Sequence, residues 1–508
     1  MVYSNYPILS GSSDRPVFAI IGGGIAGSVQ AIHLAERYPW LDIHIFDKNK
    51  KILTGTSNMN PGRPTFGFHY RCLNTATFCQ DNTVKFTKFL DRIGCPNIFA
   101  KAPQGGIYVL MKGAAQVLDD SINPVFSSDE IEPVFEQIKE HAIKNYSNDN
   151  DFKKHFGSPD QICRKLEEVE YKRFLTPGLL KGVGACYETA EKTFDTVGIC
   201  SFLREYIKGI KNIKIQTEAK VTCLEEIHQS NAARYRITWN DTSTNKSRSE
   251  VAQFLTLACW ERVGFFRKQL GKPESHPTYN RLKMLAILET EVTADRANTV
   301  RPIFAASGPF SMISPQSCIE RPDGSMICRL ACTLAIRTNV MNVLDDRVLP
   351  TDYDNMLEGT NDAEEKMKMA APILEGAKQF FSCLSNAKLA EVRFGTVRVP
   401  FGAGGNVDLH DPASEHHSRD YPGCSDLGDG LFVNEAMKMI YSVYNAEMML
   451  DWAHAELCGM NHKLTHASKA KAATKGALAI INKSTHSLKS ATQKSGYETA
   501  LMSTRLAI

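Results

Sequence analysis

The chain has 508 residues, of which 43% are hydrophobic and 23% are charged. This length exceeds what one hydrophobic core normally serves, so we expect two or three lobes. The formal net charge of +3 is small for this size and gives no reason to invoke nucleic acid as the main partner. The fourteen cysteines are scattered without a C-x-x-C pair, a pattern that favours reduced thiols over a zinc site.

The N-terminal sixteen residues are polar and lack the basic and apolar segments of a signal peptide. The longest apolar run, residues 17–27, is interrupted by four glycines and is too short to span a bilayer. We therefore expect a soluble, cytoplasmic protein.

A strand–helix–strand unit opens the chain. The short apolar run Val17–Ile21 is typical of a parallel strand buried on both faces. A glycine loop follows at residues 22–27, and apolar residues then recur at helical spacing over 28–38. Residues 43–46 form the second predicted strand, so the unit has the length of a βαβ motif.

The later sequence changes in character. Residues 54–70 are rich in Gly, Pro, Asn and Ser and predict an irregular loop. Helical patterns cover 74–93, 134–145 and 363–385, and a last strand and helix are expected within 430–457. Alternating patterns typical of antiparallel strands cover 214–227, 234–239, 251–259, 283–292 and 326–336. We therefore predict an α/β protein, α+β overall, in which a Rossmann-type domain is joined to a second, mainly antiparallel domain.

The glycine loop has the residues that dinucleotide binding requires. Gly22 permits the tight turn out of the strand, Gly24 lets the backbone approach a pyrophosphate, and Gly27 lets helix and strand pack closely. The N–H groups of the first helical turn would then face the phosphates. The predicted binding loop is Gly22-Gly23-Gly24-Ile25-Ala26-Gly27. The alternative is a glycine-rich turn without a ligand.

Asp47 ends the second predicted strand, twenty residues after Gly27. A carboxylate there can accept both ribose hydroxyls and would repel a 2′-phosphate, which favours FAD or NAD over NADP. The long loop and antiparallel pattern that follow favour FAD over NAD. A second glycine-rich segment at 401–405 is not followed by a helix start, so we expect no second dinucleotide site.

These segments resemble the D-amino-acid-oxidase superfamily of FAD enzymes, and residues 55–70 are particularly similar to its L-2-hydroxyglutarate dehydrogenase branch. The resemblance rests on Asp47-Lys48, on the small-residue loop at 55–60 and on the Gly-aromatic stretch at 66–70. Looser similarity extends over residues 16–456, in segments at 184–196, 215–224, 254–260, 397–400 and 430–447. The resemblance implies that Lys48, Ser57 and Val221 join the glycine loop and Asp47 in binding FAD.

The resemblance also implies a domain division. An FAD-binding domain would comprise 16–100, 187–265 and 395–456, and a substrate domain would comprise 101–186 and 266–394. The segment 460–508 is a basic tail, for which we predict disorder or, alternatively, a helix that contacts a membrane surface or a partner.

Two segments depart from the family pattern. Ala258-Cys259-Trp260 and Asn434-Glu435-Ala436 stand where the family has glycines next to the isoalloxazine ring. Glycine at such places allows the backbone to approach a ligand closely. The departures therefore concern the catalytic end of the flavin more than the adenine end.

The family's chemistry implies an FAD-dependent oxidoreductase that oxidises a small amino or hydroxy acid by hydride transfer to flavin N5. We expect His69 and Tyr70 to contact the substrate or assist proton removal; alternatively both only pack the loop. Arg398 is expected to hold a substrate carboxylate, with Arg63 and Arg329 as weaker candidates. The alternative for these arginines is a surface or interlobe salt bridge.

Two other functions remain open at this stage. One is a different flavoenzyme, either a monooxygenase or a non-redox mutase. The other is a flavin-stabilised binding or scaffold protein, which the substituted glycines and the basic tail support. The substrate and the electron acceptor are left undetermined.

Overall fold

The structure is a computed structural model. It describes residues 15–63, 65–112, 115–118, 120–122, 127–227, 234–274, 278–305, 311–344, 348–360, 362–400 and 423–460. Residues 1–14, the glycine-rich segment at 401–405 and the tail beyond residue 460 lie outside the described residues, and with them the predictions made for those segments.

The predicted opening unit is confirmed. Strand β1 (Val17–Ile21) is buried at four of its five residues, helix α1 (Ile25–Arg37) follows the glycine loop, and strand β2 (Asp42–Phe46) pairs in parallel with β1. The following loop contains one short helix, α2 (Thr56–Met59), which the sequence did not predict.

A six-stranded sheet is built around this unit, in the order β19-β20-β12-β1-β2-β8. Its later strands are β8 (Ile213–Gln216), β12 (Phe254–Leu257), β19 (Cys424–Asp426) and β20 (Leu431–Asn434). Five of its strands run parallel to one another: β1, β2, β8, β12 and β20. The sixth, β19, pairs antiparallel with β20. The carboxyl ends of the parallel strands therefore meet at one edge of the sheet.

This sheet corrects two strand predictions. The antiparallel segment predicted at 214–227 divides into β8, which is parallel, and β9 (Ala219–Glu226). The segment predicted at 251–259 likewise divides between β11 (Lys246–Ala252) and the parallel β12. Strands β9, β10 (Tyr235–Asp241) and β11 form a separate three-stranded antiparallel sheet.

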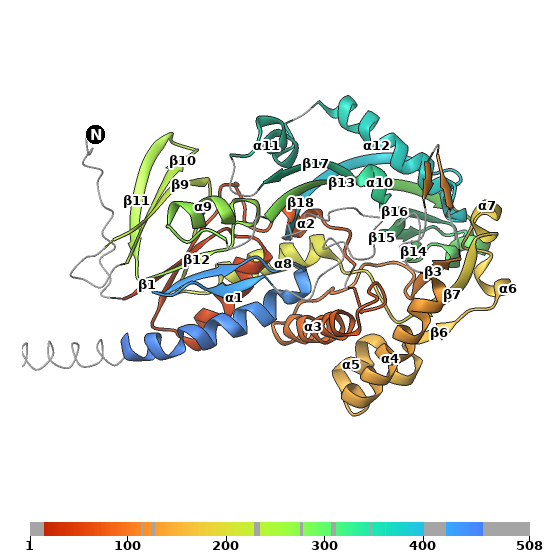
Figure 1. Cartoon of the computed structure of the whole chain (residues 1–508), viewed down its shortest axis with the longest axis horizontal. Coiled ribbons are helices and arrows are strands. Elements are labelled where there is room, and N and C mark those ends of the chain that lie inside the picture. The colour runs from red at the N-terminus through yellow and green to blue at the C-terminus, as the bar shows by residue number, and fades with distance from the viewer. Residues whose placement is uncertain are drawn as a thin grey trace, which may run out of the picture. The chain divides into compact units, whose positions relative to one another are not determined.

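The second large sheet has nine strands and is mainly antiparallel. Its strands are β3 (Gly106–Met111), β6 (Cys163–Lys165), β7 (Val183–Thr189), β13 (Thr278–Val292), β14 (Ile303–Ala305), β15 (Met312–Glu320), β16 (Met326–Thr333), β17 (Asn339–Leu344) and β18 (Lys388–Pro400). Only the β14–β3 pair is parallel. Helix α12 (Ala363–Lys378) packs across β13, β16 and β18 (Figure 1).

The remaining helices lie mainly beside these sheets (Figure 1). Their bounds are α3 (Leu73–Arg92), α4 (Ser128–Tyr146), α5 (Asn150–Phe156), α6 (Glu168–Tyr171), α7 (Pro177–Leu180), α8 (Thr196–Lys208), α9 (Val263–Gln269), α10 (Ala335–Thr338) and α11 (Thr351–Glu358). A two-stranded ribbon joins β4 (Ala115–Val117) to β5 (Asp120–Ile122). Among the described residues, no helix is both long and apolar enough to cross a membrane.

The chain divides into two compact units, Met1–Leu450 and Asp451–Ile508. Residues 442–450 are helical in the first unit, and residues 451–460 are helical in the second. Within the first unit, the predicted boundaries at 186/187 and 394/395 fall inside β7 and β18. The division into FAD-binding and substrate domains stays a prediction.

Candidate functional site

The glycine loop turns at the carboxyl end of β1. Gly22 has a φ of +108°, and a Cβ there would lie 2.3 Å from the carbonyl oxygen of Ala258. A Cβ on Gly27 would lie 2.2 Å from the carbonyl oxygen of Gly22. Gly24 differs, because its Cβ would meet only Ser57 Oγ, at 3.4 Å. Gly23 is also crowded, since its Cβ would lie 2.4 Å from Ile52 Cγ2. Packing thus requires Gly22, Gly23 and Gly27, whereas Gly24 leaves space in front of the helix.

The N-terminus of α1 faces this space. Gly24 is its N-cap, so no side chain of the cap satisfies the first N–H groups, and the first turn carries no acidic residue. The N–H of Ile25 donates to Ser57 Oγ at 2.9 Å. A helix N-terminus whose first turn meets a neutral hydroxyl and no carboxylate is suited to an anion, because N–H groups and helix dipole both favour negative charge.

Asp47 lies beside the same loop. Its carboxylate accepts the N–H of Gly23 at 2.8 Å and the N–H of Asn49 at 2.8 Å. Burial raises the pKa of Asp47, while these two hydrogen bonds act in the opposite direction. A carboxylate has about four acceptor sites, so two remain for other donors.

The start of β9 places Val221 near Asp47. The N–H of Ala219 donates to the carbonyl oxygen of Asp47 at 2.8 Å, and Val221 follows two residues later. Val221 is partly buried and packs against a core cluster that includes Phe46 and Trp239. The structure thus brings this predicted residue close to the end of β2.

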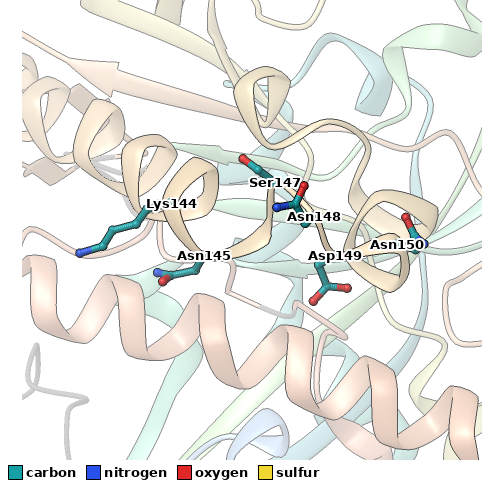
Figure 2. A pocket seen from close by; sticks show the side chains of 6 residues that line it. All are labelled: Lys144, Asn145, Ser147, Asn148, Asp149 and Asn150. Carbon is teal, nitrogen blue, oxygen red and sulfur yellow. The ribbon is translucent and has the colours of Figure 1, made fainter.

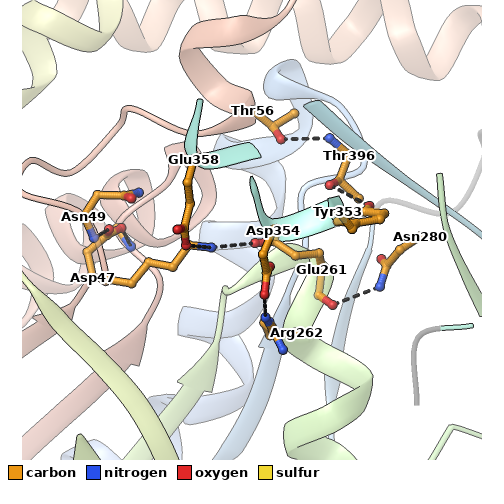
Figure 3. A network of polar contacts seen from close by, with 12 residues as sticks. Asp47, Asn49, Thr56, Glu261, Arg262, Asn280, Tyr353, Asp354, Glu358 and Thr396 are labelled. Carbon is orange, nitrogen blue, oxygen red and sulfur yellow. Dashed lines mark hydrogen bonds and ion pairs between the residues drawn. The ribbon is translucent and has the colours of Figure 1, made fainter. Parts of the chain in front are cut away.

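Lys48, directly after Asp47, connects the end of β2 to α11. Its ammonium lies 3.5 Å from Glu261 and 3.8 Å from Glu358. Burial lowers the pKa of Lys48, but the acidic groups around it, Glu261 first, raise it above its usual value overall. In the same network, Arg262 donates a hydrogen bond to Asp354 of α11 at 2.7 Å (Figure 3).

Thr396 of β18 joins three segments of the chain. Its N–H donates to Thr56 Oγ1 at 3.2 Å, its carbonyl oxygen accepts the indole N–H of Trp260 at 2.7 Å, and its hydroxyl lies 2.9 Å from the hydroxyl of Tyr353. Figure 3 shows Thr56 and Tyr353 directed toward Thr396. The second sheet therefore meets the carboxyl edge of the six-stranded sheet at this residue.

Arg398 follows two residues later on β18 and is only 1% exposed. Its guanidinium donates to Glu274 Oε1 at 3.1 Å and also pairs with Glu435. Arg267 of α9 lies 3.3 Å from the same oxygen of Glu274. The sequence singled out Arg398 as a candidate but not Glu274 or Glu435, with which the structure pairs it.

His69 and Tyr70 lie at the end of the loop that precedes α3. The ring of His69 is 4.6 Å from that of Phe304 on β14 and 5.0 Å from that of Tyr70. Lys438 Nζ lies 5.3 Å from the centre of the Tyr70 ring and donates to Thr65 Oγ1 at 3.3 Å. Because Lys438 belongs to the segment after β20, these two aromatic residues also adjoin the sheet edge.

The guanidinium of Arg63 is held by neighbouring side chains of the protein. Its guanidinium donates to Glu191 at 2.9 Å and to the hydroxyl of Tyr108, and it stacks 4.6 Å from the Phe304 ring centre. Glu191, 1% exposed, also accepts the Tyr108 hydroxyl at 2.6 Å. Arg329, by contrast, is exposed on β16 and pairs with Glu391 at 2.9 Å, the surface salt bridge that was its alternative interpretation.

Residues 434–438, at the end of β20 and directly after it, contact the glycine loop, Arg398 and Tyr70. The Asn434 amide donates to the carbonyl oxygen of Ala26 at 3.2 Å, Glu435 pairs with Arg398, and Lys438 reaches Tyr70. Ala436 has a φ of +42°, a conformation in which glycine is the usual residue. Apart from Arg329, the predicted site residues thus lie in three groups, around the glycine loop, around Arg398 and around His69 and Tyr70, and this segment contacts each group.

A shallow polar hollow of about 460 Å³ lies at the turn between α4 and α5. Figure 2 shows the side chains that line it: Lys144, Asn145, Ser147, Asn148, Asp149 and Asn150. None of them is a predicted site residue, and we assign the hollow no role in the site.

No family model matches the chain, and no curated protein does. Several solved structures share its fold. The L-amino acid deaminase from Proteus vulgaris has 16% sequence identity and a TM-score of 0.53, covering 88% of this chain and 96% of that one. Glycine oxidase from Geobacillus kaustophilus has 13% identity and a TM-score of 0.53, covering 86% and 94%. The L-alpha-glycerophosphate oxidase from Mycoplasma pneumoniae, solved with FAD bound, has 14% identity and a TM-score of 0.52, covering 86% and 95%.

These similarities establish the fold. The predicted class, a Rossmann-type α/β domain with a second, mainly antiparallel sheet, is confirmed. The three neighbours are an L-amino acid deaminase, a glycine oxidase and a glycerophosphate oxidase, and at these identities the similarity shows a shared fold. The resemblance to the L-2-hydroxyglutarate dehydrogenase branch is not confirmed and stays a prediction.

Proposed function

We propose that the chain is an FAD-dependent oxidoreductase that oxidises a small amino or hydroxy acid by hydride transfer to flavin N5. The shared fold with an L-amino acid deaminase, a glycine oxidase and an FAD-bound glycerophosphate oxidase supports this reaction class. Similarity of fold alone does not assign a reaction, so the proposal depends on the residues of the site.

The observation that carries the proposal is the open N-terminus of α1 beside Asp47. Gly24 leaves space there, no side chain of the N-cap occupies the first N–H groups, and the Asp47 carboxylate stands at the end of the adjacent strand. These groups fit the pyrophosphate and the ribose of a dinucleotide. Residues Gly22 to Gly27, Ser57 and Asp47 would hold that end, with Lys48 and Val221 beside it.

FAD, when bound, supplies the hydride acceptor for the reaction. The chain's own residues bind and orient the substrate and handle its proton. Arg398 is the proposed partner of a substrate carboxylate, and the imidazole of His69 is the proposed proton acceptor, because histidine titrates near neutral pH. Tyr70, in edge contact with His69, would hold that ring in place.

An absorbance spectrum of the purified protein, followed by anaerobic titration, tests the proposal. We expect a flavin spectrum, and bleaching of it by members of a panel of amino and hydroxy acids. Reduction only by a nicotinamide would point to a different flavoenzyme class, and bound flavin that nothing reduces would point to a binding or scaffold protein. Protein that is colourless and does not take up added FAD would contradict the proposal altogether.

The roles of His69 and Tyr70 have a separate test. Once a substrate is identified, His69→Ala should lower kcat by about two orders of magnitude, the usual contribution of a general base. Tyr70→Phe should have a smaller effect. Unchanged turnover in both variants would leave these residues with packing roles only.

A further inference from the structure

Two cysteines face each other across the hairpin that β15 and β16 form. The antiparallel register places Cys318 of β15 directly opposite Cys328 of β16. Among the strand pairs that the structure describes, this is the one register position at which both residues are cysteine. Cys328 follows Cys318 by ten positions in the sequence, so no C-x-x-C spacing marks the pair.

The backbone of the hairpin brings these two side chains close together. The N–H of Cys318 donates to the carbonyl oxygen of Lys101 at 2.9 Å, so it points away from β16, and the two cysteines form a non-hydrogen-bonded pair. In such a pair the Cα atoms are about 4.5 Å apart, and the side chains lie closer than in a hydrogen-bonded pair. A disulfide needs a Cα separation of about 4.4–6.8 Å, so its formation requires little movement of the backbone.

The two thiols interact with each other, and they differ in exposure. Cys318 donates a hydrogen bond to Cys328, which raises the pKa of Cys318 and lowers that of Cys328. Cys318 is only partly buried, whereas Cys328 is fully buried in the core cluster against which Cys318 packs. Cys318 is therefore the thiol that a small oxidant reaches first, with Cys328 behind it.

Two further cysteines of the same core cluster, Cys332 and Cys383, are unreactive by comparison. Cys332 faces no cysteine in its described register with β13 or with β15. Burial raises the pKa of the Cys332 thiol and raises that of Cys383 to about 12. Thiols buried in this way are inert, so Cys328 is the expected partner of an oxidised Cys318.

We propose that Cys318 and Cys328 are a redox modification site, which a peroxide converts into a disulfide that closes the β15–β16 hairpin. The Cys318 sulfur attacks one oxygen of hydrogen peroxide, the O–O bond breaks, and the Cys318 proton leaves with the other oxygen as water. The Cys328 sulfur then attacks the sulfur of the resulting sulfenic acid, the S–O bond breaks, and the Cys328 proton leaves with the displaced hydroxide as a second water. Two thiols are oxidised to one disulfide by two electrons, and the peroxide is reduced to two molecules of water.

This site goes beyond the proposed flavin chemistry, because it needs neither FAD nor substrate. The disulfide joins residues that are already paired in the folded chain, so it restricts mainly the unfolded chain and should stabilise the fold. Excess dithiothreitol should reverse it by thiol–disulfide exchange. The modification would thus be a reversible cross-link in the second large sheet.

Peptide mapping of the full chain tests the site directly. The reduced protein is treated with hydrogen peroxide, its remaining thiols are alkylated in denaturant, and it is digested with an endoproteinase that cleaves before aspartate, which separates the two cysteines at Asp323. We expect two peptides joined through Cys318 and Cys328 that dithiothreitol separates. Cys223 should be recovered alkylated, because it is also partly buried on an antiparallel strand but faces Thr238.

Matched variants give a second measurement. Peroxide should raise the urea midpoint of the unaltered chain and of Cys223→Ser, and dithiothreitol should return both midpoints to their starting values. Cys318→Ser cannot form the disulfide, so its midpoint should not rise. If Cys318→Ser does not fold, the peptide map of the unaltered chain still decides.

Three results would overturn the proposal. These are alkylated Cys328 in the peroxide-treated folded chain, linkage of Cys318 to a different cysteine, and a cross-link that forms only after the chain is unfolded in urea. None of the three bears on flavin binding, so the proposed function is tested separately.

Discussion

Gly24 and Gly27 occupy the same loop but lack a side chain for different reasons. Gly27 is pressed against the backbone of Gly22, so any side chain there disturbs the fold, whereas a methyl group at Gly24 would meet Ser57 Oγ at an ordinary 3.4 Å. We therefore expect Gly24→Ala to fold normally and to lose FAD, because the methyl group would fill the space proposed for the pyrophosphate. Circular dichroism and the flavin absorbance of the purified variant check the two halves of this prediction.

A matched control lies nearby in the same region. Gly55 has no atom within 4 Å of its added Cβ, so Gly55→Ala should retain both fold and flavin. Full flavin occupancy in Gly24→Ala would show that the space in front of α1 does not hold the cofactor.

Glu274 gives a prediction about pH. Burial raises its pKa, but Arg398, the hydrogen bond from Thr278 and Arg267 together lower it below the usual 4.5. A carboxyl group whose pKa is lowered by folding stabilises the native state above its unfolded pKa and loses that contribution as the pH falls through the folded value. Urea unfolding between pH 7 and 3 should therefore show a loss of stability below about pH 4.5 that is smaller in Glu274→Gln than in the control Glu289→Gln, at an exposed glutamate of β13. Equal pH dependence in both variants would contradict it.

Residues of the candidate site could be proposed from the sequence where a local motif marks them. The glycine loop and Asp47 have fixed spacing within one βαβ unit, so no tertiary information was needed. No such motif marks Glu274 or Glu435. Their partner Arg398 is remote from Glu274 and Glu435 in sequence, so the pairing could not be inferred locally. The one available hint was that Glu435 stands where the family that the sequence resembles has glycine.

At the scale of elements, β18 carries the contact between the two large sheets through Thr396. Thr396→Val removes the hydroxyl that Tyr353 bonds, and the buried phenol loses that partner. We expect a loss of about 1–3 kcal/mol in the free energy of unfolding, measured by urea denaturation. Tyr353→Phe removes the other half of the same bond, so the double variant should lose less than the sum of the two single losses. Strict additivity would mean that the bond contributes nothing.

Elements were predictable to different degrees for a physical reason. Strand β1, helix α1 and strand β2 are specified by local periodicity and by the glycine loop between them. The direction of β8 and β12 depends on which distant strands they pair with, and β12 lies between β1 and β20, which come from opposite ends of the chain. Alternation within 214–227 and 251–259 could not reveal those partners, so the parts of these segments that form β8 and β12 were wrongly predicted as antiparallel.

At the scale of the whole molecule, FAD should act as a stabiliser. A ligand that binds only the folded chain adds about 2.7 kcal/mol at a free concentration of 100 times its Kd. Removal of FAD should thus lower the Tm, and adding it back should restore the Tm in a concentration-dependent way, as followed by circular dichroism. Gly24→Ala should show no response to added FAD, and an equal response would indicate binding elsewhere.

The order β19-β20-β12-β1-β2-β8 has a consequence for biosynthesis. The chain emerges from the ribosome with β1 and β2 first, but β12 and β20, which cover one side of β1, are translated more than two hundred and four hundred residues later. Until residue 434 has emerged, β12 presents an unpaired edge, and unpaired edges are prone to aggregation. Chaperone supply during translation should therefore affect the yield of soluble protein more than it would for a chain whose nucleotide-binding sheet is contiguous.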